Sequence, residues 1–260
     1  PPIHSLVAAV TAGVTEPVLI VKGGASPHTY TLRPSEMRAL YNADAIFWVD
    51  ERVSPFLAKP LSTLRAETRQ VRLLDLPGLT RLPARRGGTW EDDHAHEHEA
   101  EAHGDEVDPH IWLDPENARH IVAAVAETLA GLDPANADRY SANAREMDQR
   151  LAALERELAR HLAPVADTPY LVFHDAYQYL EHRYRLHAVG ALTISPDRRP
   201  GARRLTEIRD RIKHLGVRCV FREPQFPPKL VETIIEGSPV RVGVLDPLGA
   251  KLQPGSRLYD

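Results

Sequence analysis

Residues 133–164, DPANADRYSANAREMDQRLAALERELARHLAP, decide the fold, because they predict one helix longer than any other element of the chain. Asp133 can cap the start of this helix, Pro134 suits its first turn, and Pro164 cannot continue it. A single apolar stripe at helical spacing is formed by Leu151, Leu154, Leu158 and Leu162. Such a helix spans roughly 40 Å. A coiled-coil arm is one interpretation, but strand patterns on both sides favour a rigid strut between two lobes.

Short apolar runs alternate with helical patterns on both sides of this stretch. We predict strands at 4–10, 18–22, 45–49, 71–76, 170–173, 186–191, 217–221 and 240–245, and helices at 35–42, 55–64, 115–132, 175–184, 201–215 and 227–236. Strands that alternate with helices indicate βαβ units and mostly parallel sheets. The predicted class is therefore α/β, with an N-terminal lobe at 1–132, a connecting helix at 133–163 and a C-terminal lobe at 164–260.

The composition excludes several classes of protein. Of the 260 residues 43% are hydrophobic and 26% are charged, as in ordinary globular proteins, so a wholly disordered chain is excluded. No apolar run approaches the roughly 20 residues that cross a bilayer, and a net charge of -4 argues against a nucleic-acid binder. The one cysteine, Cys219, precludes an internal disulfide and a cysteine-based metal site. Any metal site must use histidines and carboxylates.

Residues 85–107 have neither a helical nor a strand pattern, and we expect a mobile loop there. Four of the 13 histidines of the chain lie in it among acidic residues: His94, His96, His98 and His103. Tracts of this kind collect borderline metals, zinc above all. The alternative is a solvated run of charges. Because a flexible tract binds metal with modest affinity, we expect an auxiliary collector or sensor rather than the principal site.

Three other histidines lie in turns or at the ends of predicted strands. His28 follows the second strand, His174 closes the strand at 170–173, and His110 lies in the turn before the helix at 115–132. In open α/β sheets, ligands bind outside the carboxyl ends of strands. Each histidine alone is more often structural, but three in such positions favour a metal site.

Two carboxylates are candidates for a fourth ligand. Asp246 ends the strand at 240–245 and could add one oxygen to three imidazole nitrogens around zinc. The alternative is a turn aspartate that binds its own backbone. Glu223, at the end of the strand at 217–221, is a similar but weaker candidate.

Six stretches, in this order, resemble the metal-binding solute-binding proteins of ABC transporters (cluster A-I, the metal-binding lipoprotein-like family), and specifically their zinc-specific ZnuA-type members. The stretches are GASPHTY (24–30), LRPS (32–35), DPHIWLDP (108–115), FHDAY (173–177), FREPQF (221–226) and LDPLG (245–249). The resemblance implies two α/β lobes joined by a long helix, with Zn²⁺ in the cleft between them. It also implies His28, His110 and His174 as ligands, with Asp246 or water at the fourth position.

The resemblance further implies a periplasmic protein whose signal peptide has been removed. Such a protein captures Zn²⁺ and delivers it to the ABC transporter permease of the inner membrane, with a zinc metallochaperone as a further partner. It is expected to be a monomer that binds no nucleic acid. Two departures stand out: some zinc-type relatives carry a disulfide in the second lobe, which Cys219 alone cannot form, and the histidine-rich loop is short.

The choice of zinc rests on His174, since manganese-type relatives carry a carboxylate at that position. Imidazole favours zinc over manganese, although copper(II) and nickel would also bind such a site. A zinc hydrolase is the competing class, because three histidines and an open position are also a catalytic arrangement. The sequence contains neither a His-Glu-x-x-His helix nor a Gly-x-Ser-x-Gly elbow. A surface adhesin on the same scaffold would add no motif of its own. We therefore predict a transport protein and not an enzyme.

Overall fold

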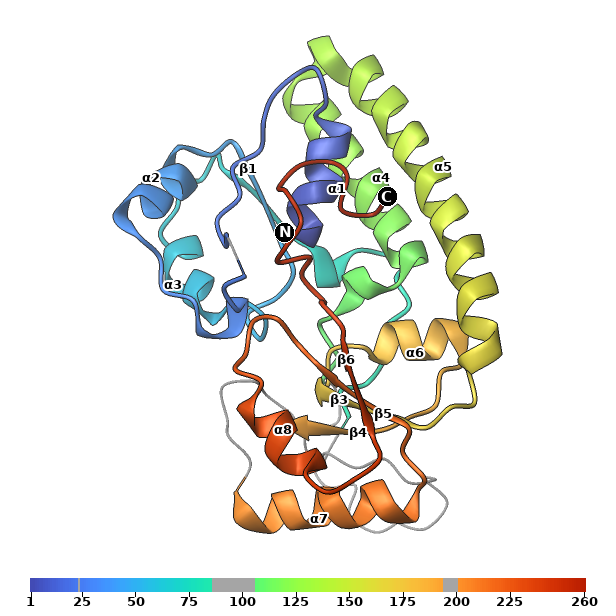
Figure 1. Cartoon of the computed structure of the whole chain (residues 1–260). Coiled ribbons are helices and arrows are strands. Elements are labelled where there is room, and N and C mark those ends of the chain that lie inside the picture. The colour runs from blue at the N-terminus through green and yellow to red at the C-terminus, as the bar shows by residue number, and fades with distance from the viewer. Residues whose placement is uncertain (23, 86–105, 194–200) are drawn as a thin grey trace. The chain divides into compact units, whose positions relative to one another are not determined.

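The computed structural model of the chain describes residues 1–22, 24–85, 106–193 and 201–260. The chain divides into two compact units (Figure 1). The first unit contains Pro1–Thr80, Ile111–Leu158 and Leu248–Asp260, and the second contains Arg81–His110 and Ala159–Pro247. Among the described residues, no helix is both long enough and apolar enough to cross a membrane.

The first unit combines a small parallel sheet with several helices. Its sheet pairs β1 (Ala45–Trp48) with β2 (Arg69–Arg72), and Ala45 lies opposite Arg69. One core cluster joins Leu40, Ile46, Leu57 and Leu61. The remaining elements of the unit are α1 (Pro2–Val10), η1 (Pro27–Thr29), α2 (Pro34–Asn42), η2 (Pro55–Leu57), α3 (Ala58–Leu61), η3 (Leu73–Asp75), η4 (Ile111–Leu113), α4 (Pro115–Leu132), η5 (Pro134–Asn136) and most of α5 (Ala137–Leu162).

The two longest helices of the first unit, α4 and α5, run side by side (Figure 1) and are joined by a bond of 2.6 Å from Arg119 Nε to Asp148 Oδ1. Asp114 caps α4 by accepting a hydrogen bond from Glu116 N, as predicted. The predicted long helix is confirmed as α5, with 26 residues. It begins at Ala137, after the short turn of η5. Of the four leucines in the predicted stripe only Leu151 is buried, because the buried residues of α5 lie between Tyr140 and Leu151.

The second unit holds a parallel sheet of four strands in the order β4-β3-β5-β6. Helices connect successive strands, as in βαβ units, so the predicted α/β class is confirmed. One core cluster takes side chains from the sheet and from α7 and α8, among them Leu171, Leu192, Ile208 and Ile234. The elements are η6 (Ala163–Val165), β3 (Tyr170–His174), α6 (Gln178–Tyr184), β4 (Ala188–Thr193), α7 (Ala202–His214), β5 (Cys219–Arg222), α8 (Lys229–Ile235) and β6 (Arg241–Val244).

Two predicted strands are wrong. Residues 4–10 lie in helix α1, and residues 18–22 form no strand. A short apolar run fits a buried helix as well as a buried strand. In α1, Pro2 stands in the first turn and Ser5, Leu6, Ala9 and Val10 are buried at helical spacing.

The division of the chain also differs from the expected lobes. Residues 81–110 group with the second unit, and residues 248–260 return to the first. The C-terminal segment is held there by hydrogen bonds from Leu258 N to Ser5 Oγ (3.2 Å) and from Tyr259 Oη to Trp112 O (3.1 Å). These bonds join residues far apart in the sequence, so no local pattern predicts them.

Candidate metal centre

His174 is the last residue of β3, a strand that is buried along its whole length. Its Nδ1 lies 2.6 Å from Oε1 of Glu223. Glu223 follows β5 directly, and β5 is the parallel neighbour of β3. The carboxyl ends of the two strands therefore bring these side chains together, and both are buried, with 4% and 1% of their surface exposed.

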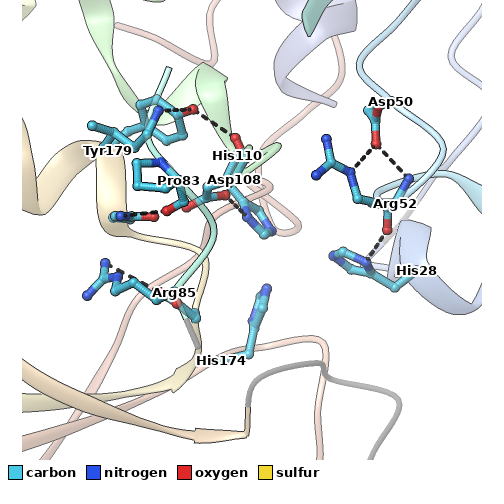
Figure 2. A network of polar contacts seen from close by, with 12 residues as sticks. His28, Asp50, Arg52, Pro83, Arg85, Asp108, His110, His174 and Tyr179 are labelled. Atoms are coloured by element: carbon cyan, nitrogen blue, oxygen red, sulfur yellow. Dashed lines mark hydrogen bonds and ion pairs between the residues drawn. The ribbon is translucent and has the colours of Figure 1, made fainter. Parts of the chain in front are cut away.

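His110 repeats this arrangement at the segment that precedes η4. Its Nδ1 lies 2.7 Å from Oδ1 of Asp108, and the same oxygen accepts a hydrogen bond of 2.9 Å from the backbone N–H of His110 (Figure 2). Both residues are buried. The two bonds to one carboxylate fix the backbone turn and the ring at the same time.

His110 and His174 lie side by side within the second unit. Their ring centroids are 5.4 Å apart with an interplanar angle of 63°, and each offers a ring nitrogen within 4.8 Å of the other. Because a carboxylate engages Nδ1 in both rings, Nε2 is the nitrogen that would bind a metal. A carboxylate behind a ligating imidazole fixes the ring orientation and raises its basicity. Two such imidazoles form half of a tetrahedral zinc site.

His28 lies in the first unit, in the single turn of η1. Its Nδ1 is 3.1 Å from the carbonyl oxygen of Arg52 (Figure 2). A carbonyl oxygen can only accept, so Nδ1 carries the hydrogen and Nε2 is again the candidate ligand atom. Asp50 holds Arg52 in turn. Oδ1 of Asp50 accepts hydrogen bonds from Nε of Arg52 (2.7 Å) and from the backbone N–H of Arg52 (2.9 Å). All three predicted histidines thus have Nδ1 engaged by oxygen.

Of the other predicted ligands, the structure describes Asp246 but not the loop histidines. Asp246 follows Leu245 at the end of β6 and is half-buried, and its Oδ1 accepts a hydrogen bond of 2.8 Å from Gln225 Nε2. This bond joins Asp246 to a side chain 21 residues away, so it is not the bond to its own backbone that the alternative expects. The loop histidines His94, His96, His98 and His103 lie outside the described residues.

A buried charge cluster lies beside His174, and sequence reasoning missed it. Arg85 pairs with Asp175 at 3.3 Å and with Glu181 more closely. Burial raises the pKa of Asp175 to about 7; Arg85 opposes this rise, and the neighbouring carboxylates Asp108 and Glu181 add to it. The role of Glu223 behind His174 was also missed. Its place at the end of a predicted strand and its position within the FREPQF stretch (221–226) were the available signals.

The fold and the paired imidazoles define a class: an α/β protein with a histidine-based candidate centre for a borderline metal ion. The whole chain, residues 1–260, matches the family described as zinc-uptake complex component A, periplasmic. The high-affinity zinc uptake system protein ZnuA of Brucella abortus (strain 2308) is 46% identical over 283 residues, which cover 99% of this chain and 85% of that protein.

Solved structures agree with the sequence match. A structure described as the crystal structure of ZnuA superposes with a TM-score of 0.81 at 27% identity, and covers 96% of this chain and 90% of its own. A zinc-bound deletion mutant of ZnuA gives a TM-score of 0.79 at 27% identity, with 96% and 88% coverage. The chain therefore belongs to the ZnuA family of periplasmic zinc-uptake components, as the sequence motifs predict.

Proposed function

We propose that the chain is a periplasmic carrier that binds one Zn²⁺ with high affinity through His28, His110 and His174 and passes it to the permease of an ABC transporter. The observation that carries this proposal is the buried pair of His110 and His174, each backed by a carboxylate on Nδ1. Asp246 or a water molecule completes the four ligands. Imidazole nitrogen is a good donor for zinc, and relatives in the family are named for zinc uptake.

The position of Glu223 supports a carrier over a zinc hydrolase. A hydrolase needs a general base beside the metal-bound water. Glu223, the candidate base, contacts Nδ1 of His174, on the opposite side of the ring from Nε2. Its carboxylate thus lies behind the proposed ligand rather than beside the metal. We therefore assign no catalytic role to the site.

The remaining parts of the proposal concern partners and the histidine-rich loop. The loaded carrier acts as a monomer in the periplasm, docks on the inner-membrane permease and can receive Zn²⁺ from a metallochaperone. The histidines at 94, 96, 98 and 103 add weaker zinc sites and raise the local supply of metal.

Titration of metal-free protein with Zn²⁺ against a competing chelator tests the site. His28→Ala, His110→Ala and His174→Ala should each weaken the tight site by more than about 100-fold, because losing only a ligand's hydrogen-bond partner typically costs about 10–100-fold. His187→Ala, which removes an exposed imidazole of the second unit, is the matched control and should bind like the parent chain. A variant that keeps full affinity removes that histidine from the ligand set.

A further inference from the structure

Two stretches of chain, residues 82–85 and 106–110, pair with each other and carry His110; we call them the His110 arm. Ala84 N donates to Glu106 O at 2.7 Å, and Asp108 N donates to Leu82 O at 2.8 Å. Pro83 and Val107 form an antiparallel bridge between these bonds. The arm ends at His110, so the position of the arm sets the position of that imidazole.

Helix α6, which follows His174 after a short turn, holds the arm through Tyr179. This tyrosine is fully buried, with 0% of its surface exposed. Its hydroxyl donates to Asp108 O at 2.8 Å and accepts from Leu82 N at 3.2 Å, so one oxygen binds both strands of the arm (Figure 2). The neighbouring Gln178 donates from Nε2 to Pro83 O at 3.1 Å.

Arg85 adds an ionic contact between the arm and the chain after His174. Its guanidinium pairs with Asp175, which is adjacent to His174, and with Glu181 of α6. The side chains of these two carboxylates are only 8% and 7% exposed, and that of Arg85 is 18% exposed. Buried carboxylates need a compensating cation, so this contact is costly to break.

These contacts form a continuous path from one imidazole to the other. Tyr179 holds the backbone of Asp108, and the carboxylate of Asp108 holds the ring and the backbone N–H of His110. At the other end, α6 is joined to His174 through only three intervening residues. A site whose ligands are already in place loses less conformational freedom on binding than one that must assemble.

We propose that Tyr179 and Arg85 are positioning residues of the zinc site, which fasten the His110 arm to α6 and set the separation of His110 and His174 before the metal arrives. The inference rests on the proposed function and deepens it. It assigns zinc affinity to side chains that touch no metal. The same contacts also hold residues 82–85 and 106–110, which flank the histidine-rich segment.

The test measures Zn²⁺ affinity by chelator competition in single variants of the whole chain. Tyr179→Phe keeps the packed ring and removes only the bridging hydroxyl. Because Tyr179 acts on His110 through Asp108, the substitution should weaken the tight site by about 10-fold, the lower end of the loss that follows removal of a ligand's direct partner. Arg85→Gln should also weaken it, and Arg85→Lys should recover part of the loss because the cation is kept. Gln178→Ala removes one exposed bond and should have a smaller effect in the same direction.

Tyr140→Phe is the matched control for stability. Tyr140 is a buried tyrosine of the first unit, 2% exposed, whose hydroxyl donates to Asp133 Oδ2 at 2.9 Å. It should lower the melting temperature like Tyr179→Phe but leave Zn²⁺ affinity unchanged. Visible absorption of the Co²⁺-loaded proteins provides a second readout, because its bands report ligand geometry. We expect altered bands in Tyr179→Phe and parental bands in Tyr140→Phe.

The outcomes separate this inference from the proposed function. Tight Zn²⁺ binding and parental Co²⁺ bands in Tyr179→Phe and Arg85→Gln would overturn the positioning role and leave the carrier intact. Absence of tight binding in the parent chain would overturn both. If Tyr179→Phe does not fold, the other three variants, Gln178→Ala, Arg85→Gln and Arg85→Lys, test the positioning role. Parental Zn²⁺ affinity in all three would overturn the inference.

Discussion

Asp50 is fully buried in the first unit, and its carboxylate is shared between Arg52 and Arg72. Burial alone would raise the pKa of this carboxyl, but hydrogen bonds from the two arginines outweigh it and hold the pKa below its ordinary value. A carboxyl whose pKa is lower in the folded chain stabilises that chain at neutral pH, and the contribution is lost as the pH falls through the folded pKa.

Asp50→Asn should therefore lower the free energy of unfolding at pH 7 by about 1–3 kcal/mol, the range for a bond to a charged group or a buried group left unsatisfied. The difference from the parent chain should shrink below about pH 4, where the carboxyl in the unfolded chain is protonated. Urea denaturation at pH 7 and pH 3 measures this, with the exposed Asp44→Asn as control. An equal loss at both pH values would show that the charge of Asp50 contributes nothing.

For single residues, the sequence predicted the candidate imidazoles but not the carboxylates that contact their Nδ1 atoms. The motifs placed His110 and His174 in turns and at strand ends, which the structure confirms. The bond between His174 and Glu223 joins residues 49 positions apart and exists because β3 and β5 are neighbours in the sheet. Strand order is a tertiary property, so no motif could reveal this pair. The contact between His110 Nδ1 and Asp108 Oδ1 is local, and both residues lie within the DPHIWLDP stretch (108–115).

Among the elements, α5 holds the end of α1 through Asn143, and Arg139 of the same helix adds a longer bond to Ala12 O (3.4 Å). Asn143 is buried, and its Nδ2 donates to Val10 O at 2.8 Å and to Ala12 O at 2.9 Å, where α1 ends. The last carbonyls of a helix have no partner within the helix, so a side-chain donor there satisfies groups that would otherwise need water.

Asn143→Ala should cost about 1–3 kcal/mol of unfolding free energy, because it leaves the buried carbonyl of Val10 without this donor. Gln149→Ala removes an exposed amide from the same helix and should change stability by less than about 0.5 kcal/mol. Urea denaturation compares both with the parent chain. Equal and small effects would mean that water replaces the amide of Asn143 without loss.

Elements with strong periodicity and clear end signals were predictable, and α1 was not. Asp114 and Pro115 mark the start of α4. Asp133 and Pro134 precede the turn of η5, after which α5 begins at Ala137, so both helices lie close to where the pattern indicates. In α1 the run Ser5–Val10 is apolar at every position but the first, so its period is hidden. Burial of one face, which only the folded unit provides, decides between helix and strand there.

Across the chain, each unit is built from more than one segment. The boundaries lie after residues 80, 110, 158 and 247, so the long helix is not the single connection between the units. The His110 arm shows why this matters for function. Residues 81–110 belong to the second unit through contacts with α6, although they precede α4 in the sequence. The histidine-rich segment is therefore attached, at both its ends, to the unit that holds the His110 and His174 pair.

Deleting residues 92–105 tests whether that segment is auxiliary. The bond of 2.7 Å between Ala84 N and Glu106 O brings the two flanking stretches together, so residues 86–91 remain to link Arg85 to Glu106 without removing any residue of the arm. We expect native mass spectrometry to count one tight Zn²⁺ in the deleted chain and to show the loss of weaker equivalents, because the imidazoles of a His-rich tract are expected to bind metal weakly and independently. Loss of the tight equivalent, with an unchanged melting temperature, would place the principal zinc site in the segment. Retention of every equivalent would remove the segment from metal binding.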